Sequence, residues 1–274
     1  MDVRLLDSPL VFLEATLDLR AADPVRTNVI GSIAQGVING RRYERETWFV
    51  AENDGVVVGA AAWTVPHKLI VSPMSADAAR AIGACAAGLG IPVPGVVGDE
   101  ATCRAVVDGI GRDAEMGMRE RILVLHDYLP PRPVPGVPRL TGESDSDFVV
   151  AWLDQFMIDA GIPVVDTRAA ERASRGRLWL WEVDGAPVSM AGHAPIITTP
   201  SGNVARLGPV YTPESLRGHG YGSAVTAAVT EHLRPRAGTV MLYTDASNPT
   251  SNAIYERLGY IHEHDVVELV LPTG

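Results

Sequence analysis

The sequence predicts an α/β (α+β) protein built from two similar halves. Each half shows the same order of apolar strand-like runs and helix-like runs, and a proline-rich segment separates the halves. In each half an Asp-Gly pair lies between two apolar runs, at Asp54-Gly55 and at Asp184-Gly185. Asp-Gly in that setting is the strongest short-range signal for a β-hairpin. These observations favour a tandem duplication of one α/β unit. Two unrelated domains that share only strand–helix alternation are the alternative.

The boundary between the halves is the segment 129–138, which contains Pro130, Pro131, Pro133, Pro135 and Pro138. Proline cannot continue a helix and has no N–H for a central strand. A stiff, extended linker is therefore expected. The prediction places one domain at residues 1–128, a linker at 129–139 and a second domain at 140–274.

The elements of each half follow from the spacing of apolar residues. The first half predicts strands at 48–51, 56–63, 68–71, 92–97 and 121–127, with helices at 77–87 and 100–110. The second half predicts strands at 178–181, 186–194, 204–212, 239–244 and 260–271. Its predicted helices are 147–160, a shorter charged one at 167–175, 223–233 and 250–258.

Composition narrows the class of protein. The chain has 274 residues, 46% of them hydrophobic, and its 23 basic and 33 acidic residues give a formal charge of −10. An acidic chain is a poor partner for nucleic acid or an anionic membrane, so neither is expected. The two cysteines, Cys85 and Cys103, favour a reduced, cytoplasmic setting. Because charged residues lie near the N-terminus, no signal peptide is expected, and no apolar run reaches the length of a membrane span.

The glycine-rich segment 217–222, Arg-Gly-His-Gly-Tyr-Gly, lies between a predicted strand and a predicted helix. Glycine lets the backbone come close to a ligand because it has no Cβ. A helix that begins there points unpaired N–H groups and the positive end of its dipole at that ligand. The segment therefore predicts a cradle for a diphosphate.

Two common diphosphate sites do not fit this loop. A P-loop ends in Gly-Lys-Ser/Thr, and here the loop ends in Tyr221-Gly222-Ser223 with no lysine. A dinucleotide fingerprint needs glycines at the first, third and sixth places, but Ser223 holds the sixth place here. Its first glycine should also follow the strand directly, whereas residues 213–217 intervene. Asp245 does lie where a ribose-binding acid would fall, although too little chain follows for such a sheet.

The chain resembles the GNAT N-acetyltransferase superfamily at two motifs. Residues 210–213 and 217–222 are similar to the family's acyl-CoA-binding pattern Gln/Arg-x-x-Gly-x-Gly/Ala. Residues 248–260 are similar to its second signature, an Asn seven residues before a Tyr, followed by Leu-Gly-Phe/Tyr. In the first half, residues 70–77 stand where the cradle should be but carry neither the arginine nor the glycines. We therefore interpret the N-terminal copy as degenerate, without coenzyme binding.

The resemblance implies tandem GNAT-like domains, each with a mixed, mostly antiparallel twisted sheet flanked by helices. It implies that acetyl-CoA is the cosubstrate and that no metal is needed. The residues that match the family's coenzyme site are Val210, Tyr211, Thr212, Arg217, Gly218, His219, Gly220, Tyr221, Gly222, Ser223, Asn248 and Asn252.

The same resemblance implies the catalytic groups. Tyr255 matches the family's general acid, which would protonate the leaving thiolate. His193 or Glu182 lies near the place of a general base, with a solvated surface residue as the alternative for each. The implied reaction is transfer of an acetyl group to a primary amine of a small molecule or peptide, within a ternary complex. A monomer or homodimer is expected.

Two rival functions stay open. A non-catalytic acyl-CoA sensor would keep coenzyme binding and lose turnover, and the retained Tyr255 argues against it. A mycothiol-synthase-like acetyltransferase would share the two-copy layout, although no residue indicates a thiol-sugar site. The identity of the acceptor cannot be predicted from the sequence, and the acidic balance favours a cationic amine.

Overall fold

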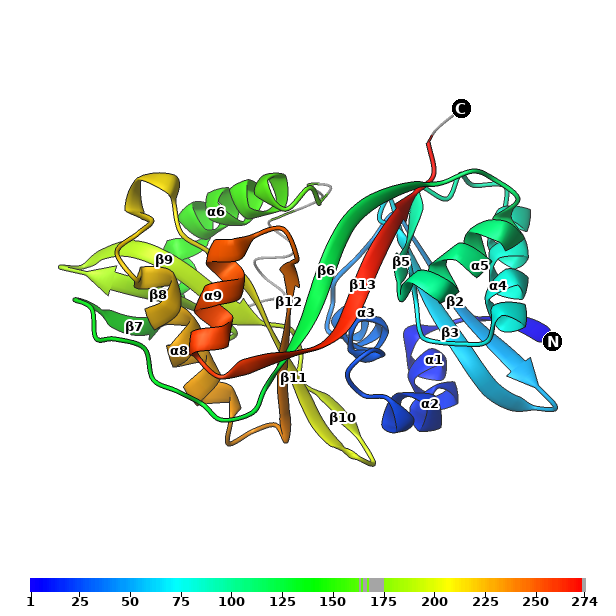
Figure 1. Cartoon of the computed structure of the whole chain (residues 1–274), viewed down its shortest axis with the longest axis horizontal. Coiled ribbons are helices and arrows are strands. Elements are labelled where there is room, and N and C mark those ends of the chain that lie inside the picture. Colours follow the sequence, from blue (N-terminus) through cyan, green and yellow to red (C-terminus); the bar gives the residue numbers. More distant parts are fainter. Residues whose placement is uncertain (163, 165–166, 168–174, 273–274) are drawn as a thin grey trace. The chain divides into compact units, whose positions relative to one another are not determined.

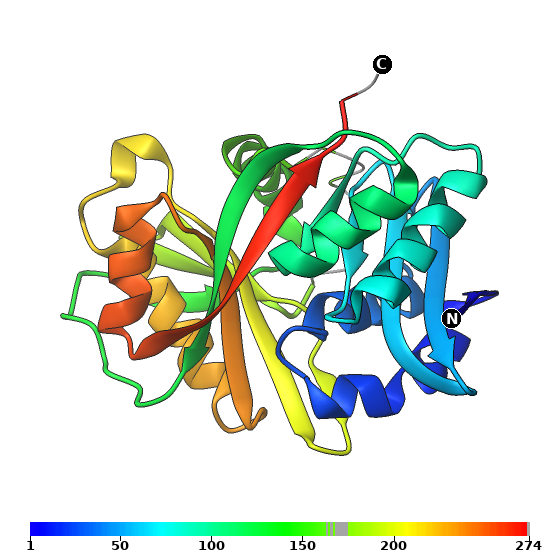
Figure 2. The ribbon, with the colours of Figure 1, turned by 45° about the vertical axis from the view of Figure 1, so that its right-hand side comes forward.

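The computed structural model describes residues 1–162, 164, 167 and 175–272. The chain forms two compact units, and each unit contains segments from distant parts of the sequence. Unit 1 consists of Met1–Arg121, Ile197–Gly202 and His264–Gly274. Unit 2 consists of Ile122–Ile196 and Asn203–Glu263. Figures 1 and 2 show the ribbon in two views.

Unit 1 is a mixed sheet with helices on both faces. Its sheet order is β1-β2-β3-β4-β5 followed by the end of β13. Its strands are β1 (Asp2–Leu6), β2 (Arg45–Asn53), β3 (Val56–Val65), β4 (Leu69–Val71), β5 (Gly95–Gly98), most of β6 (Glu115–Leu125) and β10 (Ile197–Thr199). Its helices are α1 (Pro9–Ala15), α2 (Leu17–Ala22), α3 (Asn28–Ile38), α4 (Ala76–Gly88) and α5 (Glu100–Ile110).

Unit 2 carries the glycine-rich loop. Its sheet contains the run β12-β11-β9-β8-β7. Its strands are β7 (Val137–Leu140), β8 (Leu178–Val183), β9 (Ala186–His193), β11 (Gly202–Tyr211), β12 (Thr239–Asp245) and the first part of β13 (Tyr260–Val270). Its helical elements are η1 (Glu143–Asp145), α6 (Ser146–Asp159), η2 (Glu214–Leu216), α8 (Tyr221–Leu233) and α9 (Pro249–Arg257).

The two units repeat one pattern of strand pairing. In unit 1 the β2–β3 hairpin pairs antiparallel with β4, and β4 pairs parallel with β5. In unit 2 the β8–β9 hairpin pairs antiparallel with β11, and β11 pairs parallel with β12. The two sheets are therefore mixed and mostly antiparallel, which confirms the predicted fold class.

Both predicted hairpin turns are present with the same backbone geometry. Asp54 and Asp184 each have a φ of 51°, and the glycines that follow have φ of 79° and 78°. Positive φ at both central residues defines the turn that matches the twist of an antiparallel pair. Glycine adopts this conformation without a steric penalty, which explains the Asp-Gly sequence at both places.

Period-two alternation decides which face of each sheet a side chain covers. In unit 2, Trp179 and Ala191 pack in one cluster with residues of α8 and α9, whereas Leu180 and Met190 pack in another with residues of α6. Figure 1 shows these helices beside the strands. In unit 1, Phe49 packs with residues of α4 and α5, and Trp48 packs with residues of α1 and α3. The sheet of each unit is therefore covered on both faces, and each unit has a hydrophobic core on either side of its sheet.

The compact units differ from the linear division at 1–128, 129–139 and 140–274. The last residues of β13 pair antiparallel with β5, from Val267 opposite Gly98 to Val270 opposite Gly95, and so complete the sheet of unit 1. Residues 137–139, placed in the linker by the sequence, belong to strand β7, where Pro138 lies opposite Trp181. β7 ends the sheet order, and an edge strand tolerates a proline.

The predicted helix at 167–175 lies almost entirely outside the described residues. Among the helices that the structure does describe, none is long and apolar enough to cross a membrane.

Candidate functional site

Strands β11 and β12 separate towards their C-terminal ends. Their parallel pairing runs from Val204 opposite Thr239 to Leu207 opposite Leu242. Strand β11 continues to Tyr211 and β12 to Asp245. On its other side β11 has a register irregularity against β9 between Leu207 and Val210, and such a bulge bends the strand. The result is a stretch of β11, residues 208–211, whose edge on the β12 side is not paired with β12 and which precedes the glycine-rich loop in the chain.

The glycine-rich loop ends in an uncapped helix. Gly218 and Gly220 have φ of 83° and 84°, a region that other residues adopt only with strain. Gly220 is the N-cap of α8, and it supplies no side-chain hydrogen bond to the helix. Among the hydrogen bonds of the described residues, none is donated by the N–H groups of residues 218–223. Six backbone donors and the positive end of a helix dipole are therefore available to an anion.

Close packing holds the loop against the end of β11. A Cβ on Gly222 would lie 3.3 Å from the Thr212 hydroxyl oxygen, so a larger side chain would push the helix away from the strand. Arg217 donates from Nε to the Thr212 carbonyl at 3.0 Å and pairs through Nη2 with Asp159 at 3.2 Å. The Arg217 side chain is half exposed, so its charge still faces solvent above the loop.

The corresponding helix start in unit 1, at α4, is capped. Helix α4 is capped by Ser75, whose Oγ accepts from the N–H of Ala78 at 3.3 Å. Pro73 has no N–H to offer. The Ser72 hydroxyl accepts from the N–H of Ala60 at 3.0 Å, which ties the preceding segment to β3. A helix start that is already capped by its own side chain cannot offer the same donors to a ligand.

Two asparagines shape the turn between β12 and α9. Asn248 is the N-cap of α9 and accepts from the N–H of Ser251 at 3.0 Å. Asn252 is buried and donates from Nδ2 to the carbonyls of Asp245 and Ala246 at 3.2 and 3.3 Å. Its Oδ1 is enclosed and accepts no hydrogen bond from a described residue. Of the two predicted coenzyme ligands, Asn248 therefore already caps α9 and Asn252 already stabilises the end of β12.

Tyr255 lies on α9 in the core that α8 and α9 share with the sheet. It is 8% exposed, and its ring contacts that of Tyr260 edge to face with centroids 6.2 Å apart. The hydroxyl forms no hydrogen bond with any described residue, and its oxygen is not fully enclosed. Burial raises its pKa to about 12, so the hydroxyl keeps its proton at neutral pH and is available as a donor.

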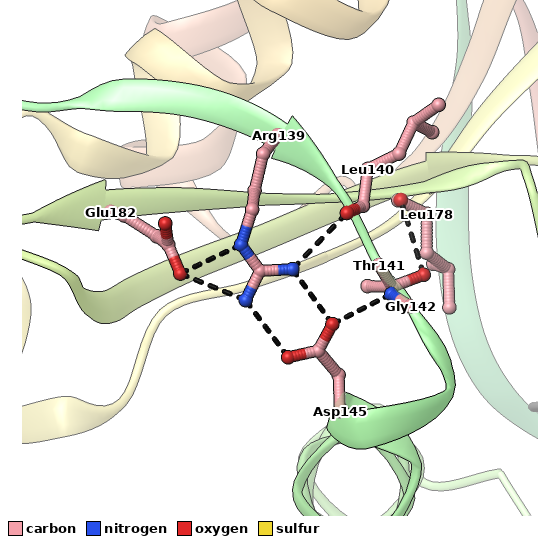
Figure 3. A network of polar contacts seen from close by, with 7 residues as sticks. All are labelled: Arg139, Leu140, Thr141, Gly142, Asp145, Leu178 and Glu182. Atoms are coloured by element: carbon pink, nitrogen blue, oxygen red, sulfur yellow. Dashed lines mark hydrogen bonds and ion pairs between the residues drawn. The ribbon is translucent and has the colours of Figure 1, made fainter.

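Glu182, one of the two predicted bases, is held in a network of charges (Figure 3). Arg139 on β7 donates to Glu182 at 2.9 and 2.8 Å and to Asp145 at 2.7 and 2.8 Å. Asp145 also accepts from the N–H of Gly142 at 2.7 Å. The hydrogen bonds from Arg139 lower the pKa of Asp145. The network joins β7, β8 and the start of α6, which is a structural role.

We predict that Arg139→Met lowers the free energy of unfolding by about 2 kcal/mol at pH 7, because two carboxylates lose a charge-assisted partner. Asp145 has a lowered pKa in the folded state, so its contribution is present above about pH 4, the unfolded value. That contribution is lost as the pH falls through the folded pKa. Urea denaturation at several pH values should show the deficit shrinking below about pH 4.

The matched control is Arg104→Met. Arg104 pairs with Glu100 four residues away, and their side chains are 60% and 39% exposed. An exposed pair of this kind contributes only about 0.5 kcal/mol. Equal losses for both variants would contradict the assigned importance of the Arg139 network.

His193, the other predicted base, packs at the far end of α8 from the glycine-rich loop. Its ring lies 5.9 Å from that of His232 in the last turn of α8 and 5.7 Å from that of Trp179. Its Nδ1 must donate to the Ala194 carbonyl at 2.7 Å, so Nε2 carries the lone pair. That Nε2 is enclosed and unpaired among the described residues. Burial lowers the pKa of His193 to about 4, so the ring is neutral.

The second half of the chain is similar to a known protein family. Residues 138–260 match the acetyltransferase (GNAT) family. These residues therefore form a GNAT-type domain. The match spans β7 to the start of β13 and so includes the separated strands, the glycine-rich loop and Tyr255.

Solved structures show the fold over the whole chain. A tandem GNAT protein from the clavulanic acid biosynthesis pathway superimposes with a TM-score of 0.63 at 17% identity, covering 100% of both chains. A GCN5-related N-acetyltransferase from Sphaerobacter thermophilus gives 0.64 at 14% identity, covering 100% of this chain and 96% of that one. The chain therefore has a tandem GNAT fold, as predicted.

A short segment resembles curated relatives more closely. Over 61 residues the chain is 46% identical to a mycothiol acetyltransferase of Salinispora tropica, and this match covers 20% of each protein. The chain thus matches about a fifth of the length of that relative.

Reasoning from the sequence missed Ser189 of β9, although this residue holds the end of β11 in place. Its hydroxyl donates to the Tyr211 carbonyl at 3.1 Å and lies 2.8 Å from the Thr212 hydroxyl. The available signal was a polar residue inside an otherwise apolar strand. No group of three or more His, Cys, Asp or Glu side chains suited to a metal occurs in the described part of the chain.

Proposed function

We propose that the chain is an acetyl-CoA-dependent N-acetyltransferase that acts on a primary amine of a small molecule or peptide. The observation that carries this proposal is the uncapped start of α8, with six unpaired N–H groups beside the separated ends of β11 and β12. The family match supports acetyl transfer, and the nature of the acceptor is our inference.

The loop suits the diphosphate of coenzyme A. Gly218 and Gly220 hold backbone conformations that a Cβ would strain, and in this loop conformation the N–H groups of residues 218–223 would bind an anion. Arg217 adds a positive charge. The free edge at Val210 to Thr212 would pair with the amides of the pantetheine arm. The Thr212 carbonyl already accepts from Arg217, so the N–H of Thr212 is its more available group.

Acetyl-CoA supplies the acetyl group as a thioester. In the transfer, the amine nitrogen forms a bond to the acetyl carbon, the carbon–sulfur bond breaks, the nitrogen loses a proton and the thiolate gains one. The chain's part is to orient both substrates and to stabilise the charge that develops. We infer that a backbone N–H in the bulged stretch 208–211 of β11, where Pro209 has none, would donate to the carbonyl oxygen.

Tyr255 would act on the leaving thiolate. A pKa of about 12 keeps its hydroxyl protonated, but it lies above the pKa of an ordinary thiol, near about 8.5. Full proton transfer would therefore be uphill in the coenzyme-free protein. We infer that Tyr255 first stabilises the thiolate by donating a hydrogen bond, and that the proton passes to the sulfur later in the turnover.

The general base stays a prediction. Glu182 is occupied by Arg139, and the free nitrogen of His193 is enclosed at the far end of α8 from the loop. An amine that binds in its neutral form needs no strong base, because its proton can leave to water after attack. We expect a cationic amine to be the natural acceptor, given the net charge of −10.

Two other functions compete with this proposal. A non-catalytic acyl-CoA sensor would share the same cradle. A mycothiol-acetyltransferase-like activity is favoured by the 46% identity over 61 residues with the Salinispora tropica protein, although that match covers only a fifth of each chain. We further propose that unit 1 does not bind coenzyme, since Ser75 already caps the equivalent helix.

The test is to incubate the chain with acetyl-CoA and a panel of amines. Acetyl transfer is measured by the release of free thiol from acetyl-CoA. We expect steady thiol release with at least one small primary amine, and none with the acceptor omitted. The panel should include a thiol-sugar amine as well as polyamines and amino acids. Binding of acetyl-CoA without thiol release for any acceptor would favour the sensor.

A further inference from the structure

The proline-rich segment is fastened along helix α8. We call residues 128–136 the strap. The Tyr128 hydroxyl donates to Glu231 in the last turn of α8 at 2.9 Å, and the Arg234 guanidinium lies over the Tyr128 ring, 4.8 Å from its centroid. At its other end, the strap carbonyl of Pro135 accepts from the indole N–H of Trp181 at 2.9 Å. In Figure 1 the strap runs from the end of β6 to β7 and passes the lower end of α8.

Between these anchors the strap touches the glycine-rich loop. A Cβ built on Gly220 would lie 2.9 Å from Cγ1 of Val134, so the Val134 methyl packs directly on the Gly220 backbone. Gly136 lets the strap lie close to β8. Its φ is 115°, and a side chain there would collide with Trp181 and Glu182. Val134 is half-buried.

We propose that Val134 lies beside the diphosphate of bound coenzyme A, so that the strap is one wall of the coenzyme site and not only a connection between the two halves. This inference rests on the proposed function. Gly220 contributes one of the six free N–H groups of the loop, and Val134 contacts that residue. A side chain at position 134 is therefore within about 8 Å of the anion, roughly one Debye length at physiological salt.

The proposal makes the sign of a charge at position 134 decisive. A unit charge about 8 Å from a doubly charged diphosphate, in a solvent-like dielectric, changes the dissociation constant by roughly three- to fivefold at low salt. Val134→Lys should tighten coenzyme A binding by that factor, and Val134→Glu should weaken it by the same factor. Val134→Gln measures the effect of lost packing alone.

Leu129 provides the matched control on the same strap. It follows Tyr128, near the last turn of α8, about 15 Å along the helix from the loop. It is 54% exposed. Leu129→Lys and Leu129→Glu should therefore have nearly equal dissociation constants.

The experiment is calorimetric titration of coenzyme A into the full chain and each variant, at low and at high salt, with melting curves to verify folding. We expect the dissociation constants of Val134→Lys and Val134→Glu to differ roughly tenfold or more at low salt and to converge as salt is added. Equal constants for these two variants, while the wild-type chain binds, would overturn the inference and leave the proposed function intact. A wild-type chain that does not bind coenzyme A would overturn both.

Discussion

Tyr255→Phe should lower kcat by about a hundredfold or more, because the thiolate loses its hydrogen-bond donor and proton source. The dissociation constant for acetyl-CoA should change by less than about twofold, since the ring and its packing remain. Steady-state kinetics with the best amine of the panel, combined with calorimetric titration of acetyl-CoA, separates the two effects. Unchanged kcat in this variant would remove Tyr255 from the mechanism.

Tyr260→Phe is the matched control. Tyr260 is buried against Tyr255, but its hydroxyl lies 2.8 Å from Thr230 Oγ1 inside the core. Its removal should cost about 1 kcal/mol of folding free energy and leave kcat nearly unchanged. Similar kcat losses in both variants would indicate a general disturbance of the core.

Gly220→Ala should weaken coenzyme A binding by at least about tenfold. A residue with a Cβ at φ of 84° carries a strain of about 1–2 kcal/mol, and here the Cβ would also meet the Val134 methyl. The loop must then shift, and its N–H groups no longer converge on one anion. Calorimetry on the folded variant measures the loss.

Alanine substitutions at two further glycines serve as comparisons for the loss of coenzyme A binding. Gly218 shares the positive φ, but no atom lies within 4 Å of the place that a Cβ would take there, so Gly218→Ala should have the smaller effect of strain alone. Gly238 has open space and no positive φ, so Gly238→Ala should bind normally. A Gly220→Ala variant that binds coenzyme A as tightly as Gly238→Ala would contradict the assigned role of the loop.

The sequence predicted the elements around the site well because their signals are local. The Asp-Gly turns, the apolar run of β11 and the glycines before α8 each lie within a few residues of one another, and backbone preferences are decided at that range. Two motifs in order then identified the family.

The long-range partners of these elements could not be predicted from the sequence. Alternating apolar residues show which face of β13 is buried but not that Leu269 lies opposite Val96 of unit 1. The sequence does not show that Glu182 is engaged, because its partner, Arg139, is 43 residues away. His193 looked apt for proton transfer, but its burial against aromatic rings depends on tertiary packing. The prolines of segment 129–139 predict an extended chain but not the contact of Val134 with Gly220.

A crystal structure of the chain with bound coenzyme A tests the central claim most directly. We expect the diphosphate oxygens within hydrogen-bond distance of the N–H groups of residues 218–223, and the pantetheine arm along the free edge of β11. A diphosphate bound in unit 1, or held only by side chains away from the start of α8, would contradict the account.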